Sequence, residues 1–133
     1  DMLSIIKKIG AHASNGKVWI TERGSCFGYN RLVVDMVSLE YLKQTGCKVF
    51  FDSTHSLQLP GGLGNATGGQ REFVFALSRA AAAVGVDGFF MEIHPKPEKA
   101  FSDPATSLDY KRFWELLRQI EKINNAWWPL KKN

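Results

Sequence analysis

The middle of the chain contains the stretch VFFDSTH (residues 49–55), in which three apolar, β-prone residues are followed at once by polar and ionisable ones. A short run that is apolar at consecutive positions is typical of a strand buried on both faces, as in parallel sheets. The stretches VWITER (18–23) and FFMEIH (89–94) have the same pattern. We therefore expect three parallel strands at 18–21, 49–51 and 89–91, each buried on both faces.

Helical patterns lie before, between and after these strands. Apolar residues recur every three or four positions in four segments, which predicts helices at 2–9, 38–43, 70–84 and 110–125. Ser38 is the expected N-cap of the second helix, and Gly85 is expected to end the third.

The order α-βα-βα-βα predicts an α/β fold of parallel βα units, which occur in closed (β/α)₈ barrels and in open doubly wound sheets. A closed barrel typically needs about 250 residues, so the 133 residues of this chain could hold only about half of one. No linker interrupts the pattern. We therefore expect residues 1–133 to form one domain without an internal boundary.

Composition argues against several classes of function. The net charge is +4, but the basic residues are mixed with acidic ones, so nucleic-acid binding is not expected. No apolar run approaches the roughly 20 residues of a membrane span, so no membrane association is expected. Two cysteines without a CxxC motif predict free thiols in a reducing compartment rather than a disulfide framework. These features predict a cytoplasmic protein.

Ionisable residues follow all three predicted strands. They are Glu22 and Arg23, Asp52 and His55, and Glu92 and His94. In parallel α/β folds the carboxyl ends of the strands meet at one edge, and that edge is the functional face. The sequence therefore predicts a polar site there.

Two kinds of ligand suit such a site. His55, Glu92 and Asp103 offer one imidazole and two carboxylates, a set that suits Fe²⁺, Mn²⁺, Co²⁺ or Zn²⁺. On spacing alone, a histidine at a strand end is more often a structural or substrate-contacting residue than a metal ligand. Arg23 can hold a phosphate or carboxylate by two parallel hydrogen bonds. We also expect Gly68–Gly69 to open a helix whose free N–H groups bind phosphate, with Arg71 in its first turn; a flexible lid or a turn is the alternative.

Several ordered runs resemble those of 3-deoxy-D-manno-octulosonate 8-phosphate synthases, and together they cover nearly the whole chain. They are TERG (21–24), FGYN (27–30), LVVDM (32–36), DSTHSLQLPGG (52–62), GGQRE (68–72), GVDGFFMEIHP (85–95) and AFSD (100–103). The run PATSL (104–108) departs from the family pattern.

The resemblance implies the C-terminal half of a (β/α)₈ TIM barrel, with the three strands as its sixth, seventh and eighth. It also implies the activity of a carbon–carbon bond-forming transferase. That enzyme condenses phosphoenolpyruvate with arabinose 5-phosphate and releases phosphate, a step of lipopolysaccharide (KDO) biosynthesis. The full-length protein would be a homo-oligomer, here expected to be a tetramer, with a divalent metal (Fe, Zn, Mn or Co) and no organic cofactor.

The resemblance also assigns roles to individual residues. His55, Glu92 and Asp103 would be three of four metal ligands, and Arg23 would hold the phosphate of phosphoenolpyruvate. The QLPGG wording is similar to the metal-dependent branch of the family, and Gln58 begins the loop that closes over the substrates. We assign catalysis to His55 and Asp52, and substrate binding to Arg23, Gln58 and Arg71.

Two other functions remain as alternatives. One is a sister synthase that condenses phosphoenolpyruvate with another aldehyde sugar, and the other is a non-catalytic module that binds a phosphorylated ligand. Because half a barrel exposes strand edges and half a core, we expect this chain alone to be inactive or poorly folded.

Overall fold

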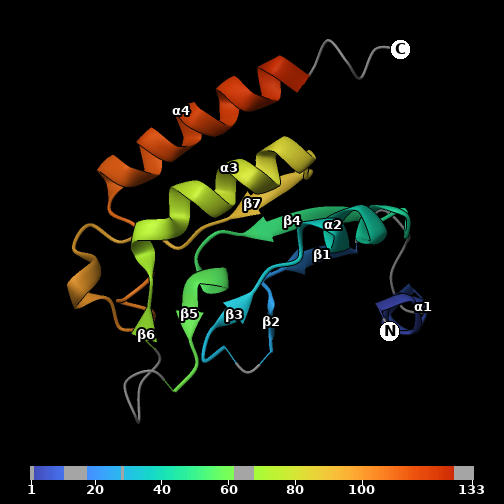
Figure 1. The fold of residues 1–133 in the computed structure, drawn as a ribbon, viewed down its shortest axis with the longest axis horizontal. Helices are drawn as coiled ribbons and strands as arrows, with labels where there is room; N and C mark the ends of the chain where they lie inside the picture. Colours follow the sequence, from blue (N-terminus) through green and yellow to red (C-terminus); the bar gives the residue numbers. More distant parts are fainter. Residues whose placement is uncertain (1, 11–17, 28, 62–67, 128–133) are drawn as a thin grey trace.

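Three parallel strands form the central sheet of the computed structural model, which describes residues 2–10, 18–27, 29–61 and 68–127 (Figure 1). The strands are β1 (Trp19–Glu22), β4 (Lys48–Asp52) and β7 (Gly88–Phe90), in the order β1-β4-β7. In the register, Phe50 of β4 lies between Thr21 of β1 and Gly88 of β7. The predicted α/β class and the three parallel strands are confirmed, although the third strand begins one residue earlier than expected.

Four α-helices accompany the sheet. They are α1 (Met2–Gly10), α2 (Met36–Lys43), α3 (Val74–Val84) and α4 (Tyr110–Trp127). Gly85 ends α3 as predicted, with φ at 86°, a left-handed value that glycine adopts without steric cost. The predicted N-cap of α2 was wrong: Asp35 caps this helix through its carboxylate, which accepts from the Val37 N–H at 2.9 Å. Ser38 instead donates its hydroxyl to the Asp35 carbonyl.

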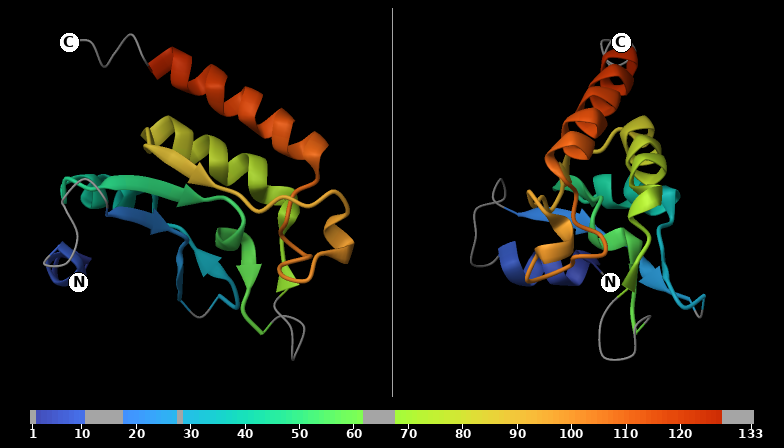
Figure 2. Two further views of the ribbon diagram at one scale, coloured as in Figure 1. Left: turned by 180° about the vertical axis from the view of Figure 1, so that it is seen from behind. Right: turned by 90° about the vertical axis from the view of Figure 1, so that its left-hand side faces the viewer.

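Two short antiparallel hairpins extend beyond the carboxyl ends of the sheet strands, where Figures 1 and 2 show them below the sheet. One pairs β2 (Ser25–Cys26) with β3 (Leu32–Val33), and the other pairs β5 (Gln58–Leu59) with β6 (Gly68–Gly69). The expectation that Gly68–Gly69 opens a helix was wrong. A Cβ on Gly69 would lie 2.3 Å from the Thr106 side chain, so glycine is required for the close approach of this strand.

The core lies on one face of the sheet, under α2, α3 and α4 (Figure 2). Val49 and Phe51 of β4 point to this face and are fully buried with Leu39 of α2. A second cluster joins α3 and α4 through Val74, Leu116 and their neighbours. Burial of these apolar side chains is the main force that holds the helices to the sheet.

The opposite face of the sheet is only partly covered by the described residues, so the expected burial of every strand on both faces was wrong. Trp19 stacks on Phe50 with ring centroids 4.7 Å apart, yet Trp19 is 64% exposed and Phe90 is 45% exposed. In a closed barrel this face points to the interior, which side chains from all eight strands fill. Three strands alone cannot fill it.

Among the described residues, three 3₁₀ turns adjoin the carboxyl edge of the sheet. They are His55–Leu57, Arg71–Phe73 and Pro97–Lys99. Arg71 therefore lies in a 3₁₀ turn before α3 and not in the first turn of the α-helix. No helix among the described residues is both long enough and apolar enough to cross a membrane.

Candidate metal centre

His55, Glu92 and Asp103 converge at the carboxyl edge of the sheet, as the sequence predicted for a metal site. His55 Nε2 lies 3.2 Å from Glu92 Oε1 and 3.7 Å from Asp103 Oδ2. One ligand atom from each of the three residues lies within 4.8 Å of the other two. Two ligands bound at about 2.1 Å in tetrahedral geometry are roughly 3.4 Å apart, so these separations suit a single ion.

Asp52, at the end of β4, fixes the orientation of His55. Asp52 is buried, 5% exposed, and its Oδ1 accepts hydrogen bonds from the backbone N–H groups of Thr54 (3.1 Å) and His55 (2.8 Å). Oδ2 lies 2.7 Å from His55 Nδ1. A carboxylate can only accept a hydrogen bond, so the proton of a neutral imidazole belongs on Nδ1. Nε2 then faces Glu92 and Asp103 with its lone pair free, as a metal ligand requires.

Glu92 is held in place by a residue that the sequence did not single out. The Thr54 hydroxyl accepts from the Glu92 backbone N–H at 2.8 Å and so ties the segment after β7 to the segment after β4. Phe90 also escaped sequence reasoning: its ring stacks on His55 at a centroid separation of 5.6 Å. Because Thr54 lies inside the DSTH run, its place between Asp52 and His55 was the available signal.

Asp103 reaches the cluster from the loop that follows the third 3₁₀ turn. Its backbone has φ at 50°, a left-handed conformation in which aspartate is one of the few tolerated side chains. Its carbonyl accepts from the N–H groups of Thr106 (3.1 Å) and Ser107 (2.9 Å), which holds the loop in this shape. An aspartate in a sparsely populated conformation beside two other ligand residues is the kind of strain that clusters at functional sites.

Gln58 connects the cluster to the predicted anion-binding residue. Its amide Nε2 donates to Asp103 Oδ1, and its Oε1 accepts from Arg23 Nη2. Arg23 therefore lies next to the cluster, as predicted, with its guanidinium exposed beside it. The three side chains form a continuous chain of hydrogen bonds from a cation to a carboxylate.

The hydrogen bonds of the other predicted polar residues go to groups outside the cluster. Arg71 donates to the Pro104 carbonyl, so it adjoins the loop that carries Asp103, and its role in substrate binding stays a prediction. Glu22 accepts from the Gly24 N–H at 2.5 Å, and His94 Nδ1 contacts the backbone of Lys96. Glu22 and His94 thus make local contacts that shape the turns after their strands.

The geometry defines a class: part of a parallel βα barrel with a three-residue group able to hold a metal at the carboxyl ends of its strands. The sequence pattern of the DAHP synthetase I family matches residues 1–127, and the chain belongs to this family.

Two curated relatives match nearly the whole chain at about 50% identity. The chain is 51% identical over 124 residues to the 2-dehydro-3-deoxyphosphooctonate aldolase of Syntrophotalea carbinolica, a match that covers 93% of the chain and 44% of that protein. It is 52% identical over 126 residues to the aldolase of the same name from Francisella philomiragia, covering 92% of the chain and 46% of that protein. The chain thus spans less than half the length of these relatives.

A solved structure supports the fold. The crystal structure of the phospho-2-dehydro-3-deoxyheptonate aldolase (DAHP synthase) of Thermotoga maritima is 34% identical and superposes with a TM-score of 0.69. The superposition covers 87% of the chain and 32% of that structure. The fold is accordingly part of a (β/α)₈ barrel, and a C-terminal half fits the length of the match.

Proposed function

We propose that residues 1–133 form one partial barrel domain that supplies the metal-binding edge of a synthase. The enzyme condenses phosphoenolpyruvate with arabinose 5-phosphate to give 3-deoxy-D-manno-octulosonate 8-phosphate and phosphate. The observation that carries this proposal is the convergence of His55, Glu92 and Asp103, with Asp52 fixing the imidazole, in a chain about 50% identical to curated aldolases named for that octulosonate phosphate.

The donor set fits a divalent ion such as Fe²⁺, Zn²⁺, Mn²⁺ or Co²⁺. His55 Nε2, Glu92 Oε1 and Asp103 Oδ2 would hold it, and Asp52 would act as a positioning residue behind the histidine. A bound divalent ion supplies a Lewis acid that can polarise an aldehyde oxygen or orient a water molecule. No organic cofactor is needed for that chemistry.

The chain's own residues supply binding and orientation. The exposed Arg23 guanidinium offers a planar fork that matches the phosphate of phosphoenolpyruvate. Gln58 stands between Arg23 and Asp103 and would place that phosphate in a fixed relation to the metal ligands. Holding two phosphorylated substrates in register removes much of the entropic barrier to their condensation.

The state of the two cysteines supports a cytoplasmic biosynthetic enzyme. Cys26 and Cys47 are both free thiols in the structure, which suits a reducing compartment.

The partly uncovered sheet face, with Trp19 and Phe90 exposed, is the face on which the rest of a barrel would pack. We propose that the complete protein is a homo-oligomer, a tetramer.

The proposal is tested with a chimera in which this chain replaces the matching segment of the Syntrophotalea carbinolica relative. Phosphate release is measured with phosphoenolpyruvate and either arabinose 5-phosphate or erythrose 4-phosphate, before and after chelation. We expect turnover with arabinose 5-phosphate that chelation abolishes and Mn²⁺ or Co²⁺ restores.

Other outcomes separate the alternatives. A preference for erythrose 4-phosphate would assign the chain to a sister synthase, in line with its 34% identity to the Thermotoga enzyme. Activity that survives thorough chelation would refute the metal role of His55, Glu92 and Asp103. No phosphate release from a folded chimera would favour a non-catalytic phospho-ligand module.

A further inference from the structure

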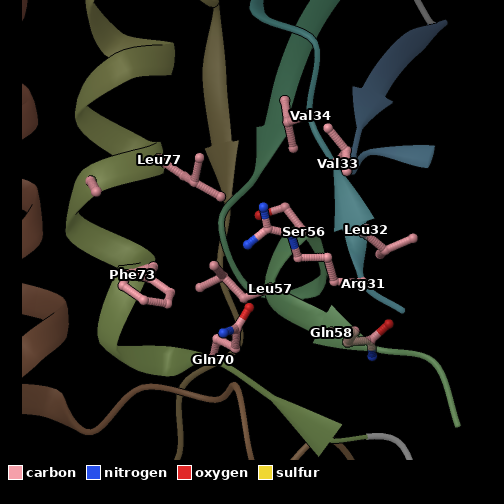
Figure 3. Close-up of a pocket in the computed structure, with 11 residues that line it drawn as sticks. Arg31, Leu32, Val33, Val34, Ser56, Leu57, Gln58, Gln70, Phe73 and Leu77 are labelled. Carbon is pink, nitrogen blue, oxygen red and sulfur yellow. The ribbon is translucent and has the colours of Figure 1, made fainter. Parts of the chain in front are cut away.

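A cavity lies between the β2–β3 hairpin, the 3₁₀ turn His55–Leu57 and the start of α3 (Figure 3). Its volume is about 310 Å³. Its lining includes none of the three metal-ligand residues, although Gln58, which bridges Arg23 and Asp103, lies in one wall. The walls are mainly apolar, with side chains from Leu57, Phe73 and Leu77 prominent in the close-up. A space of this size, at roughly 30 Å³ for each non-hydrogen group, holds about ten such groups.

Ser56 gives the cavity an unusual polar feature. The residue is only 2% exposed, and its hydroxyl has no hydrogen-bond partner among the described residues. Most buried hydroxyl groups in folded proteins have a partner, because leaving one unpaired reduces stability. A buried hydroxyl that lines a cavity and lacks a partner points to a polar group of a ligand.

Arg31 supplies a positive charge at the same place. In Figure 3 its side chain extends from the β3 side into the cavity, toward Ser56 in this view. Within the described part of the chain, its guanidinium makes no hydrogen bond or ion pair. The lining contains no aspartate or glutamate, so nothing among the lining residues neutralises this charge. Gln70 at the rim adds a further side-chain amide.

We propose that this cavity binds a small organic carboxylate with an apolar body. The carboxylate would accept hydrogen bonds from the Arg31 guanidinium and from the Ser56 hydroxyl. The apolar body would lie against Leu57, Phe73 and Leu77. An inorganic phosphate ion would leave these apolar walls in contact with water, so the mixed lining favours an amphipathic anion.

The test uses 3-phenylpropionate as the probe and its neutral amide, 3-phenylpropionamide, as the matched control. Binding is measured by ligand-observed NMR and calorimetry on the full 133-residue chain and on the chimera described above, in which the rest of the barrel is present. A probe of this size is expected to bind with a Kd on the order of 1 mM. The neutral amide should bind at least tenfold more weakly.

Two substitutions locate the binding. Arg31→Gln, at an exposed position, should weaken binding of the carboxylate at least tenfold. Ser56→Ala should weaken it about threefold to tenfold, and it should also raise the thermal midpoint of the ligand-free protein, since the unpaired hydroxyl is gone. Arg79→Gln, at an exposed position of α3 that does not line the cavity, should leave the affinity for the probe unchanged.

Three results would overturn the proposal. One is the absence of saturable binding of 3-phenylpropionate up to 20 mM (~20 times the expected Kd) in both proteins. Another is equal binding of the neutral amide, and the third is binding that Arg31→Gln and Ser56→Ala leave intact. Because the phosphate release of the chimera is measured separately from binding of the probe, failure here would leave the proposed synthase activity standing, and failure of that activity would leave this site standing.

Discussion

Replacement of Asp52 by asparagine should weaken metal binding about 10- to 100-fold, although the two side chains have nearly the same shape. Two backbone N–H groups, from Thr54 and His55, donate to Oδ1 at 3.1 and 2.8 Å, so an asparagine must place its carbonyl oxygen there. Its NH₂ group then takes the place of Oδ2, which lies 2.7 Å from His55 Nδ1. The imidazole must accept at Nδ1 and therefore carries its proton on Nε2, the atom that faces Glu92 and Asp103.

The magnitude follows from the bond that has to be broken. To ligate a metal through Nε2, the variant histidine must return its proton to Nδ1. The Nδ1–H then faces the asparagine NH₂ group, and two donors in contact at a buried position cost about 1–3 kcal/mol. This free energy corresponds to roughly a 5- to 150-fold loss of affinity. The middle of this range is the 10- to 100-fold loss usual when a group that orients a metal-binding histidine is removed.

The assay is a calorimetric titration of the metal-free chimera with Co²⁺, with circular dichroism to verify folding. Asp35→Asn is the matched control, because Asp35 is an exposed helix cap distant in sequence from the cluster. The control should bind Co²⁺ as the parent protein does. A folded Asp52→Asn protein with an affinity within threefold of the parent value would refute the view that Asp52 sets the tautomer of His55.

Three further predictions concern stability and are measured by urea unfolding of the chimera. Phe51→Ala should reduce the free energy of unfolding by about 3–5 kcal/mol, because Phe51 is fully buried. The control Tyr41→Ala, at a residue that is 65% exposed, should change this free energy by about 0.5 kcal/mol or less. Similar losses in the two variants would contradict the assignment of the core. Gly85→Ala should cost about 1–2 kcal/mol, because φ is 86° at this position, and a neutral effect would show that the helix end readjusts. The Arg112 backbone N–H, helped by the Arg112 guanidinium, holds the pKa of Asp109 below its ordinary value of 3.8. The charged form of Asp109 therefore stabilises the fold above about pH 4, and this contribution is lost as the pH falls through the lowered folded-state pKa. Asp109→Asn keeps an oxygen that accepts from the Arg112 backbone N–H but removes the charge. The free energy of unfolding of the parent should therefore be about 0.5 kcal/mol higher than that of the variant near pH 6, and the two should be equal near pH 2. A difference that does not change with pH would contradict this reasoning.

Local patterns in the sequence were sufficient for the α/β class, the three parallel strands, the end of α3 at Gly85 and the grouping of His55, Glu92 and Asp103. The reason is that a buried parallel strand consists of a short run of apolar residues. The parallel topology then brings the residues after each run to the carboxyl edge of the sheet. The alternation of helix and strand needs no knowledge of distant contacts. Composition argued only against nucleic-acid binding and a membrane span, and the family was indicated by the resemblance of ordered runs such as DSTHSLQLPGG (52–62).

Tertiary structure alone decided the features that depend on contacts between distant segments. The hydrogen bond between Thr54 and Glu92 joins residues 38 positions apart, and the bridge from Arg23 through Gln58 to Asp103 joins three segments that are distant in the sequence. Gly68–Gly69 forms a strand and not a helix start, because it pairs with Gln58–Leu59 of β5. The approach of Thr106 leaves no space for a Cβ at Gly69 in that strand. The exposure of Trp19 and Phe90 likewise depends on which elements cover the inner face of the sheet, and no local pattern in the sequence encodes that.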